Sequence, residues 1–133
     1  MKFLDANIIL RYLTNDIPRD ALRCERFLKE AEKNKEVLFI NIMVIAEIIW
    51  VLFSEYRFPK NKVITGIQKL LNSPNIHIDN KELVISTLDI FEANDIDFID
   101  AYNVAMMKQK DMNTIYSYDK HYNQIKGIQR IQP

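Results

Sequence analysis

The chain has 133 residues, of which 48% are hydrophobic and 27% are charged, with only 2 Gly. This profile fits a single globular domain over residues 1–133 and excludes a disordered or fibrous chain. The 18 Lys and Arg residues balance the 18 Asp and Glu residues, so whole-chain charge gives no support for a nucleic-acid partner, which must be argued from a site.

The first half of the chain alternates strand-like apolar runs with helical patterns. In order, the predicted elements are a strand over 2–4 that stops at Asp5, a helix through 8–13, a helix over 18–34 opened by Pro18, a strand over 37–40, and a helix over 42–56 capped by Asn41. Cys24 shares the helical spacing of Ala21 and Leu28, which predicts a buried small hydrophobe. As the only cysteine it excludes an internal disulfide.

The second half continues the same alternation. The predicted elements are a helix opened by Pro59 and carried to Leu71, a strand over 76–78, a helix capped by an Asp79–Glu82 pair, a helix over 101–110, a strand over 114–118 ending at Asp119, a short helical turn, and a strand over 128–131. Strands that alternate with helices predict an α/β sandwich with a mostly parallel sheet.

No signal peptide is visible at the start of the sequence. The most apolar segment, residues 42–53, measures about 18 Å as a helix, which is too short to span a bilayer. We therefore expect a soluble, cytoplasmic protein without membrane contact.

Glu47 is the one ionisable side chain within this apolar segment. A helix that is apolar nearly all round is expected to be buried. An isolated buried carboxylate costs several kcal/mol or takes up a proton, so Glu47 needs a cation, a hydrogen-bond network or a crevice. The alternative is that it reaches a surface edge or pairs with a Lys or Arg.

Three aspartates stand at the ends of other predicted elements: Asp5 and Asp119 where strands end, and Asp100 where a helix starts. Each alone can be a cap or a turn residue. In parallel α/β folds, however, sites form beyond the carboxyl ends of the strands. Together with Glu47 these residues can converge on one pocket, where carboxylates at close range require cations. Oxygen ligands suit Mg²⁺ or Mn²⁺, and few His and one Cys argue against zinc.

Four motifs then carry a family resemblance over nearly the whole chain. Residues 3–13 are similar to the first motif of PIN-domain ribonucleases, 44–52 resemble the second with Glu47 as its acid, 97–101 resemble the third with Asp100, and 115–119 resemble the fourth with Asp119. The resemblance is specifically to VapC-type toxins of toxin–antitoxin pairs. Ala6 and Tyr118 stand where Thr and Phe are frequent, and neither change removes a ligand oxygen.

The resemblance implies a three-layer α/β/α fold with a central, mostly parallel sheet of four to five strands. It also implies metal-dependent endonucleolytic cleavage of RNA, homodimerisation, and inhibition by a cognate antitoxin. On this hypothesis Asp5 and Asp100 bind one or two Mg²⁺ or Mn²⁺ ions directly, and Asp119 binds directly or through water. Glu47 holds the second ion or acts as a base. The expected products carry 5′-phosphate and 3′-hydroxyl ends.

Further residues are assigned supporting roles. Asn7, Asp97 and Ser117 are expected to support the carboxylates, with Asn7 and Ser117 hydrogen-bonding carboxylate oxygens. Arg11, Lys108 and Lys120 are candidate RNA-phosphate contacts, with solvated surface charges as the alternative. His121 receives no role. Apolar residues in excess of a small core, which could form a dimer interface or receive an antitoxin segment, are Leu22, Phe27, Phe53, Tyr56 and Phe58.

Competing interpretations fit less well. A phosphoacceptor signalling domain wants paired acids after the first strand and a Lys after the fifth, whereas Asp5 is followed by Ala6-Asn7 and the last strand runs to Pro133. A phosphatase with an Asp-x-Asp nucleophile fails because position 7 is Asn. The remaining alternative is a catalytically silent PIN-like module that binds RNA or protein, although all four acids are present.

Overall fold

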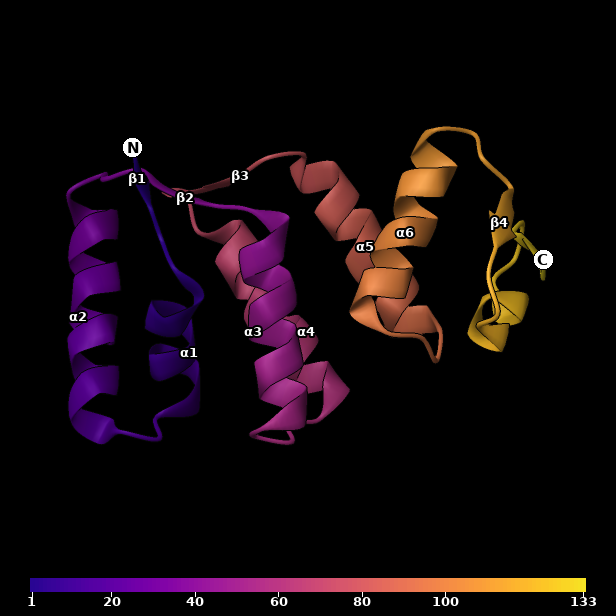
Figure 1. Ribbon diagram of the computed structural model, residues 1–133. Helices are drawn as coiled ribbons and strands as arrows, with labels where there is room; N and C mark the ends of the chain where they lie inside the picture. The colour runs from indigo at the N-terminus through magenta and orange to yellow at the C-terminus, as the bar shows by residue number, and fades with distance from the viewer. The chain divides into compact units, whose positions relative to one another are not determined.

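The computed structural model describes residues 1–133 as two compact units, Met1–Asp79 and Asn80–Pro133, each described here by itself (Figure 1). The first unit contains β1 (Lys2–Phe3), α1 (Ala6–Thr14), α2 (Pro18–Lys33), β2 (Leu38–Ile40), α3 (Ile42–Ser54), α4 (Lys60–Asn72) and β3 (Ile76–Ile78). The second unit contains α5 (Lys81–Ala93), α6 (Phe98–Gln109), β4 (Thr114–Tyr116), the short 3₁₀ helix η1 (Lys120–Gln124) and β5 (Gln129–Ile131).

The sheet of the first unit has the order β1-β2-β3, and both pairings are parallel. Phe3 lies opposite Phe39, and the Leu4 N–H donates to the Phe39 carbonyl at 2.8 Å, which extends the pairing by one residue. Because parallel strands end at the same edge of a sheet, Asp5 and Asn41 leave the sheet side by side. The parallel register therefore positions the first predicted acid at the carboxyl edge.

Helix α3 forms the centre of the core of this unit. It contacts α1 and α4, and its side chains Ile45, Ile48 and Leu52 are at most 1% exposed. The expectation that α3 is buried all round is wrong, because Met43, Glu47 and Trp50 form one exposed stripe. Their spacing of four and three residues puts them on one face, opposite the core.

The second unit is built on the pair α5–α6 and a two-stranded sheet. Phe91 and Phe98 pack edge to face with ring centroids 5.8 Å apart, and the buried hydroxyl of Thr87 donates to the Leu83 carbonyl at 2.7 Å. Strands β4 and β5 pair in parallel, with Thr114 opposite Gln129. Helix α6 begins at Phe98, so Asp100 lies in its first turn.

Two predicted helix starts differ in detail. The Asp79–Glu82 capping pair is wrong, because Asn80 caps α5 by accepting a hydrogen bond from the Leu83 N–H at 3.3 Å. Asn80 has φ +50°, a left-handed conformation that Asn tolerates better than most residues. Pro59 is the residue before α4 and not its first helical residue. Proline is tolerated at the start of a helix because its missing N–H has no partner to lose there.

The predicted fold class is confirmed. All strand pairs are parallel and the strands alternate with helices. The single domain over 1–133, with one sheet through both units, stays a prediction. None of the helices is both long and apolar enough for a membrane span.

Candidate active site

Two of the predicted acids, Asp5 and Glu47, belong to the first unit. Asp5 is the N-cap residue of α1 with extended backbone angles, yet its side chain makes no capping hydrogen bond and is exposed. Asn41, at the equivalent place after β2, does cap its helix by accepting from the Val44 N–H at 3.1 Å. The carboxylate of Asp5 is therefore not used to start α1.

Glu47 reaches the surface on the exposed stripe of α3. No ion pair or hydrogen bond of the structure involves its carboxylate. Of the two alternatives for this residue, the surface edge is therefore confirmed, and pairing with a Lys or Arg is wrong. An ionised carboxylate without a partner keeps all its lone pairs for a ligand.

Asp100 and Asp119 belong to the second unit and both have defined partners. The Tyr122 hydroxyl donates to Asp100 Oδ1 at 2.7 Å. The ring of Tyr122 is only 4% exposed, and burial raises the pKa of its hydroxyl. Tyr122 was missed from the sequence; the available signal was that a buried Tyr hydroxyl needs a polar partner.

Asp119 is the N-cap residue of η1. Its Oδ1 atom accepts from the backbone N–H of His121 at 2.8 Å and lies 2.7 Å from His121 Nδ1. These contacts, the backbone bond first, lower the pKa of the Asp119 carboxyl, and the contact between the two side chains raises the pKa of His121. His121, to which the sequence assigned no role, thus contacts a candidate ligand.

Ser117 supports Asp119 through the backbone. Its hydroxyl accepts from the Asp119 N–H at 3.0 Å, so it does not contact a carboxylate oxygen as expected. The Ser117 carbonyl accepts from Arg130 Nη1 at 2.8 Å, and Arg130 Nε donates to Asn123 Oδ1 at 3.0 Å. Strand β5 thereby fixes the start of η1 through residues that the sequence did not single out.

The other supporting residues are less constrained. Asn7 lies exposed in the first turn of α1, and Asp97 is the exposed N-cap residue of α6 without a capping bond. Lys108 and Lys120 are exposed, as a role in phosphate contact requires. Arg11 instead pairs with Asp16 at 2.9 Å.

Asp16 collects hydrogen bonds from three side chains in the first unit. The Tyr56 hydroxyl donates to it at 2.7 Å, Thr14 at 3.1 Å and Arg11 at 2.9 Å. These bonds, that from Tyr56 first, lower the pKa of Asp16 to about 2. The turn after α1 is thereby tied to the residues that follow α3.

Asp16→Asn is expected to lower the Tm at neutral pH and to change it little at pH 2. Because the folded-state pKa of about 2 lies below the ordinary value of 3.8, the carboxylate stabilises the folded state above pH 4 and loses this effect as the pH falls towards 2. Thermal unfolding of both proteins from pH 2 to pH 7 measures the difference. A Tm difference that is the same at both ends of this range contradicts the prediction.

Comparison with known proteins identifies the family. The sequence pattern of the PIN domain matches residues 2–128, which include all four acids. The chain belongs to the PIN domain family. It is 20% identical over 133 residues to a protein of Aquifex aeolicus named VapC ribonuclease, covering 100% of this chain and 97% of that one. The crystal structure of the sarcin–ricin loop-cleaving toxin VapC20 of Mycobacterium tuberculosis is 15% identical, covers 90% of each chain and superposes with a TM-score of 0.44.

The donor chemistry of this PIN domain fits a hard divalent cation. Its candidate ligands are carboxylate oxygens, which Mg²⁺ and Mn²⁺ prefer. Each unit contributes two of the four carboxylates, and neither unit by itself brings three acidic, His or Cys side chains into a metal-binding group. That all four meet at one ion stays a prediction.

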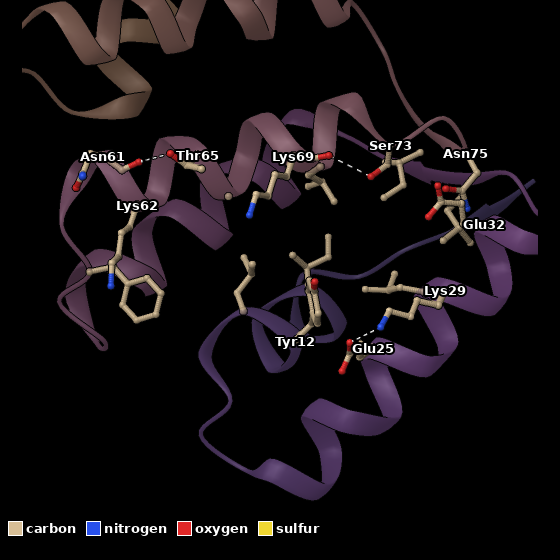
Figure 2. Close-up of a pocket in the computed structure, with 18 residues that line it drawn as sticks. Tyr12, Glu25, Lys29, Glu32, Asn61, Lys62, Thr65, Lys69, Ser73 and Asn75 are labelled. Atoms are coloured by element: carbon tan, nitrogen blue, oxygen red, sulfur yellow. Dashed lines mark hydrogen bonds and ion pairs between the residues drawn. The ribbon is translucent and has the colours of Figure 1, made fainter.

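A separate groove of this PIN domain lies within the first unit, between α1, α2 and α4, with a volume of about 730 Å³ (Figure 2). Its lining combines apolar side chains, Leu13, Leu28 and Phe58 among them, with charged ones. Figure 2 shows the ion pair Glu25–Lys29 on the α2 side, 2.6 Å long, and Lys69 on the α4 side. Of the apolar residues singled out from the sequence, Leu22 and Phe27 are 47% and 41% exposed, and Phe53, Tyr56 and Phe58 are half-buried.

Proposed function

We propose that this PIN domain is a divalent-metal-dependent endoribonuclease and the toxin of a toxin–antitoxin pair. One observation carries the proposal: the family match over residues 2–128 contains the four acids in order. Asp5 follows β1, Glu47 lies within α3, Asp100 lies in the first turn of α6, and Asp119 caps η1.

In the proposed site the four carboxylates hold one or two Mg²⁺ or Mn²⁺ ions, which supply Lewis-acid activation of water and stabilise the charge on a phosphodiester. Asp5 and Asp100 bind directly. Asp119 binds directly or through water, and Glu47 holds the second ion or takes the proton of the attacking water. Asn7, Asp97 and Ser117 support these carboxylates, Ser117 through the Asp119 amide. The products carry 5′-phosphate and 3′-hydroxyl ends.

RNA is the proposed substrate because the Aquifex aeolicus protein that matches the whole chain is named a ribonuclease. Lys108 and Lys120 are the proposed phosphate contacts on this chain. Because the net charge of the chain is zero, we propose only a local basic rim at these two lysines. We therefore expect the affinity for RNA to fall only modestly as the salt concentration rises.

The proposed partners are a second copy of the chain and a cognate antitoxin in the cytoplasm. Exposed apolar side chains such as Leu22 and Phe27 support a protein partner. The groove between α1, α2 and α4 is lined by both apolar and charged side chains, which suits an amphipathic segment of the antitoxin.

The purified chain, free of antitoxin, is expected to cleave a structured RNA when Mg²⁺ or Mn²⁺ is present and to stop when EDTA removes the ion. Gel analysis of end-labelled RNA gives the rate and the end chemistry, and light scattering of the same preparation gives the oligomeric state. Cleavage that continues in EDTA overturns the metal-dependent mechanism. Mn²⁺ binding without cleavage of any RNA would support the silent-module alternative instead.

A further inference from the structure

Within the second unit, helix η1 is tied to the first turn of α6 and to the segment just before α6. The Tyr122 hydroxyl donates to Asp100 Oδ1 at 2.7 Å. Gln124 exchanges two hydrogen bonds with the backbone of Asp95, both 3.0 Å long. Only the first of these ties ends on a carboxylate, so the two ties can be separated by experiment.

The hydroxyl of Tyr122 is a constrained donor. The residue is buried, with 4% of its surface exposed, so its ring does not turn towards solvent. The other polar contact of the hydroxyl is with Asn103 Nδ2 at 3.5 Å, where the amide donates and the hydroxyl accepts. The single hydroxyl proton is therefore committed to Asp100 Oδ1, and a bond to an ionised acceptor at this length is strong.

The bond from Tyr122 to Asp100 also bears on Asp119, the other candidate ligand of this unit. Asp119 is the residue before η1, and Tyr122 lies within η1. Asp119 is held to η1 by the backbone N–H of His121 at 2.8 Å. A series of contacts thus runs from Asp119 through η1 and the Tyr122 ring to Asp100.

We propose that Tyr122 is a positioning residue, whose buried hydroxyl fixes the carboxylate of Asp100 and its distance from Asp119 for binding a divalent cation. The inference rests on the proposed function, which assigns both aspartates to the metal. On this proposal Tyr122 acts through Asp100 and is not itself a ligand. It occupies Oδ1 of Asp100 with one hydrogen bond, and Oδ2 has no protein partner.

Tyr122→Phe removes the hydroxyl and keeps the buried ring, so it tests the bond with little effect on packing. We expect Mn²⁺ affinity, measured by titration calorimetry, to fall about 10- to 100-fold, as is typical when a residue that orients a ligand is lost. We also expect RNA cleavage by this variant to recover as the Mn²⁺ concentration is raised. In a variant whose metal-free Tm equals that of the wild type, that rescue marks a defect in metal positioning, since metal binding also stabilises a weakened fold.

Gln124→Met is the matched control, because it cuts the other tie of η1, to the backbone of Asp95 before α6, without touching a carboxylate. Its Mn²⁺ affinity is expected to equal that of the wild type. The inference is overturned if Tyr122→Phe binds Mn²⁺ as tightly as the wild type, or if Gln124→Met weakens binding equally. A wild-type chain that neither binds Mn²⁺ nor cleaves RNA overturns the proposed function and this inference together, whereas an active wild type with an unaffected Tyr122→Phe variant overturns the inference alone.

Discussion

Asp100→Asn is expected to lower the rate of metal-dependent RNA cleavage by on the order of a thousandfold. A metal ion contributes several kcal/mol to transition-state stabilisation, and about 1.4 kcal/mol corresponds to a factor of ten in rate. The amide keeps the shape of the side chain, and its carbonyl oxygen still accepts the hydrogen bond from Tyr122. The lost quantity is therefore the negative charge that the cation requires.

Asp5→Asn is expected to have the same effect for the same reason. Asn is as favourable as Asp before a helix, and the Asp5 side chain makes no capping bond that the change could remove. Initial rates on end-labelled RNA, with circular dichroism to check the fold, measure both variants. Asp89→Asn, an exposed acid of α5 outside the proposed site, is the control and should cleave normally. Full activity in Asp5→Asn or Asp100→Asn would reject the site.

Ile48→Ala is expected to lower the free energy of unfolding by about 2–5 kcal/mol, because removing a large buried aliphatic side chain leaves a cavity. Ile48 is completely buried on the core face of α3. Such a loss is a large share of the roughly 5–15 kcal/mol by which domains are stable. Chemical denaturation followed by circular dichroism measures it.

Glu47, the residue before Ile48, provides the contrast to Ile48→Ala. Glu47 is exposed and has no ion pair, so Glu47→Gln should unfold like the wild type while losing RNA cleavage. A change below about 1 kcal/mol for Ile48→Ala would show that α3 is not the centre of the core, since even smaller truncations of buried side chains cost about that much.

Local signals account for what the sequence predicted well. The spacing of Ala21 and Leu28 predicted α2, and Pro18 marked its first residue. The place of Asp5 after the first strand followed from where the apolar run stops. The strand predicted over 114–118 is too long, because β4 ends at Tyr116 and Asp119 caps η1. These features depend on neighbours a few residues away, which periodicity and capping preferences describe.

Features that depend on distant partners were not predicted. The bond from Tyr122 to Asp100 spans 22 residues, and that from Arg130 to Ser117 spans 13. Nothing in either local pattern specifies these pairs, because they arise when η1 and β5 pack in the folded unit. The burial of α3 nearly all round was predicted wrongly for a related reason: the composition of a helix gives its average polarity, but its neighbours decide which face is covered.

The division of α3 into two faces has a genetic consequence. Its core face carries Ile45, Ile48 and Leu52, and its open face carries Met43, Glu47 and Trp50. If the chain is toxic, a cell can escape it through either face of one helix. Substitutions on the core face would leave an unstable product that proteolysis removes, whereas a substitution at Glu47 would leave a folded product without RNA cleavage.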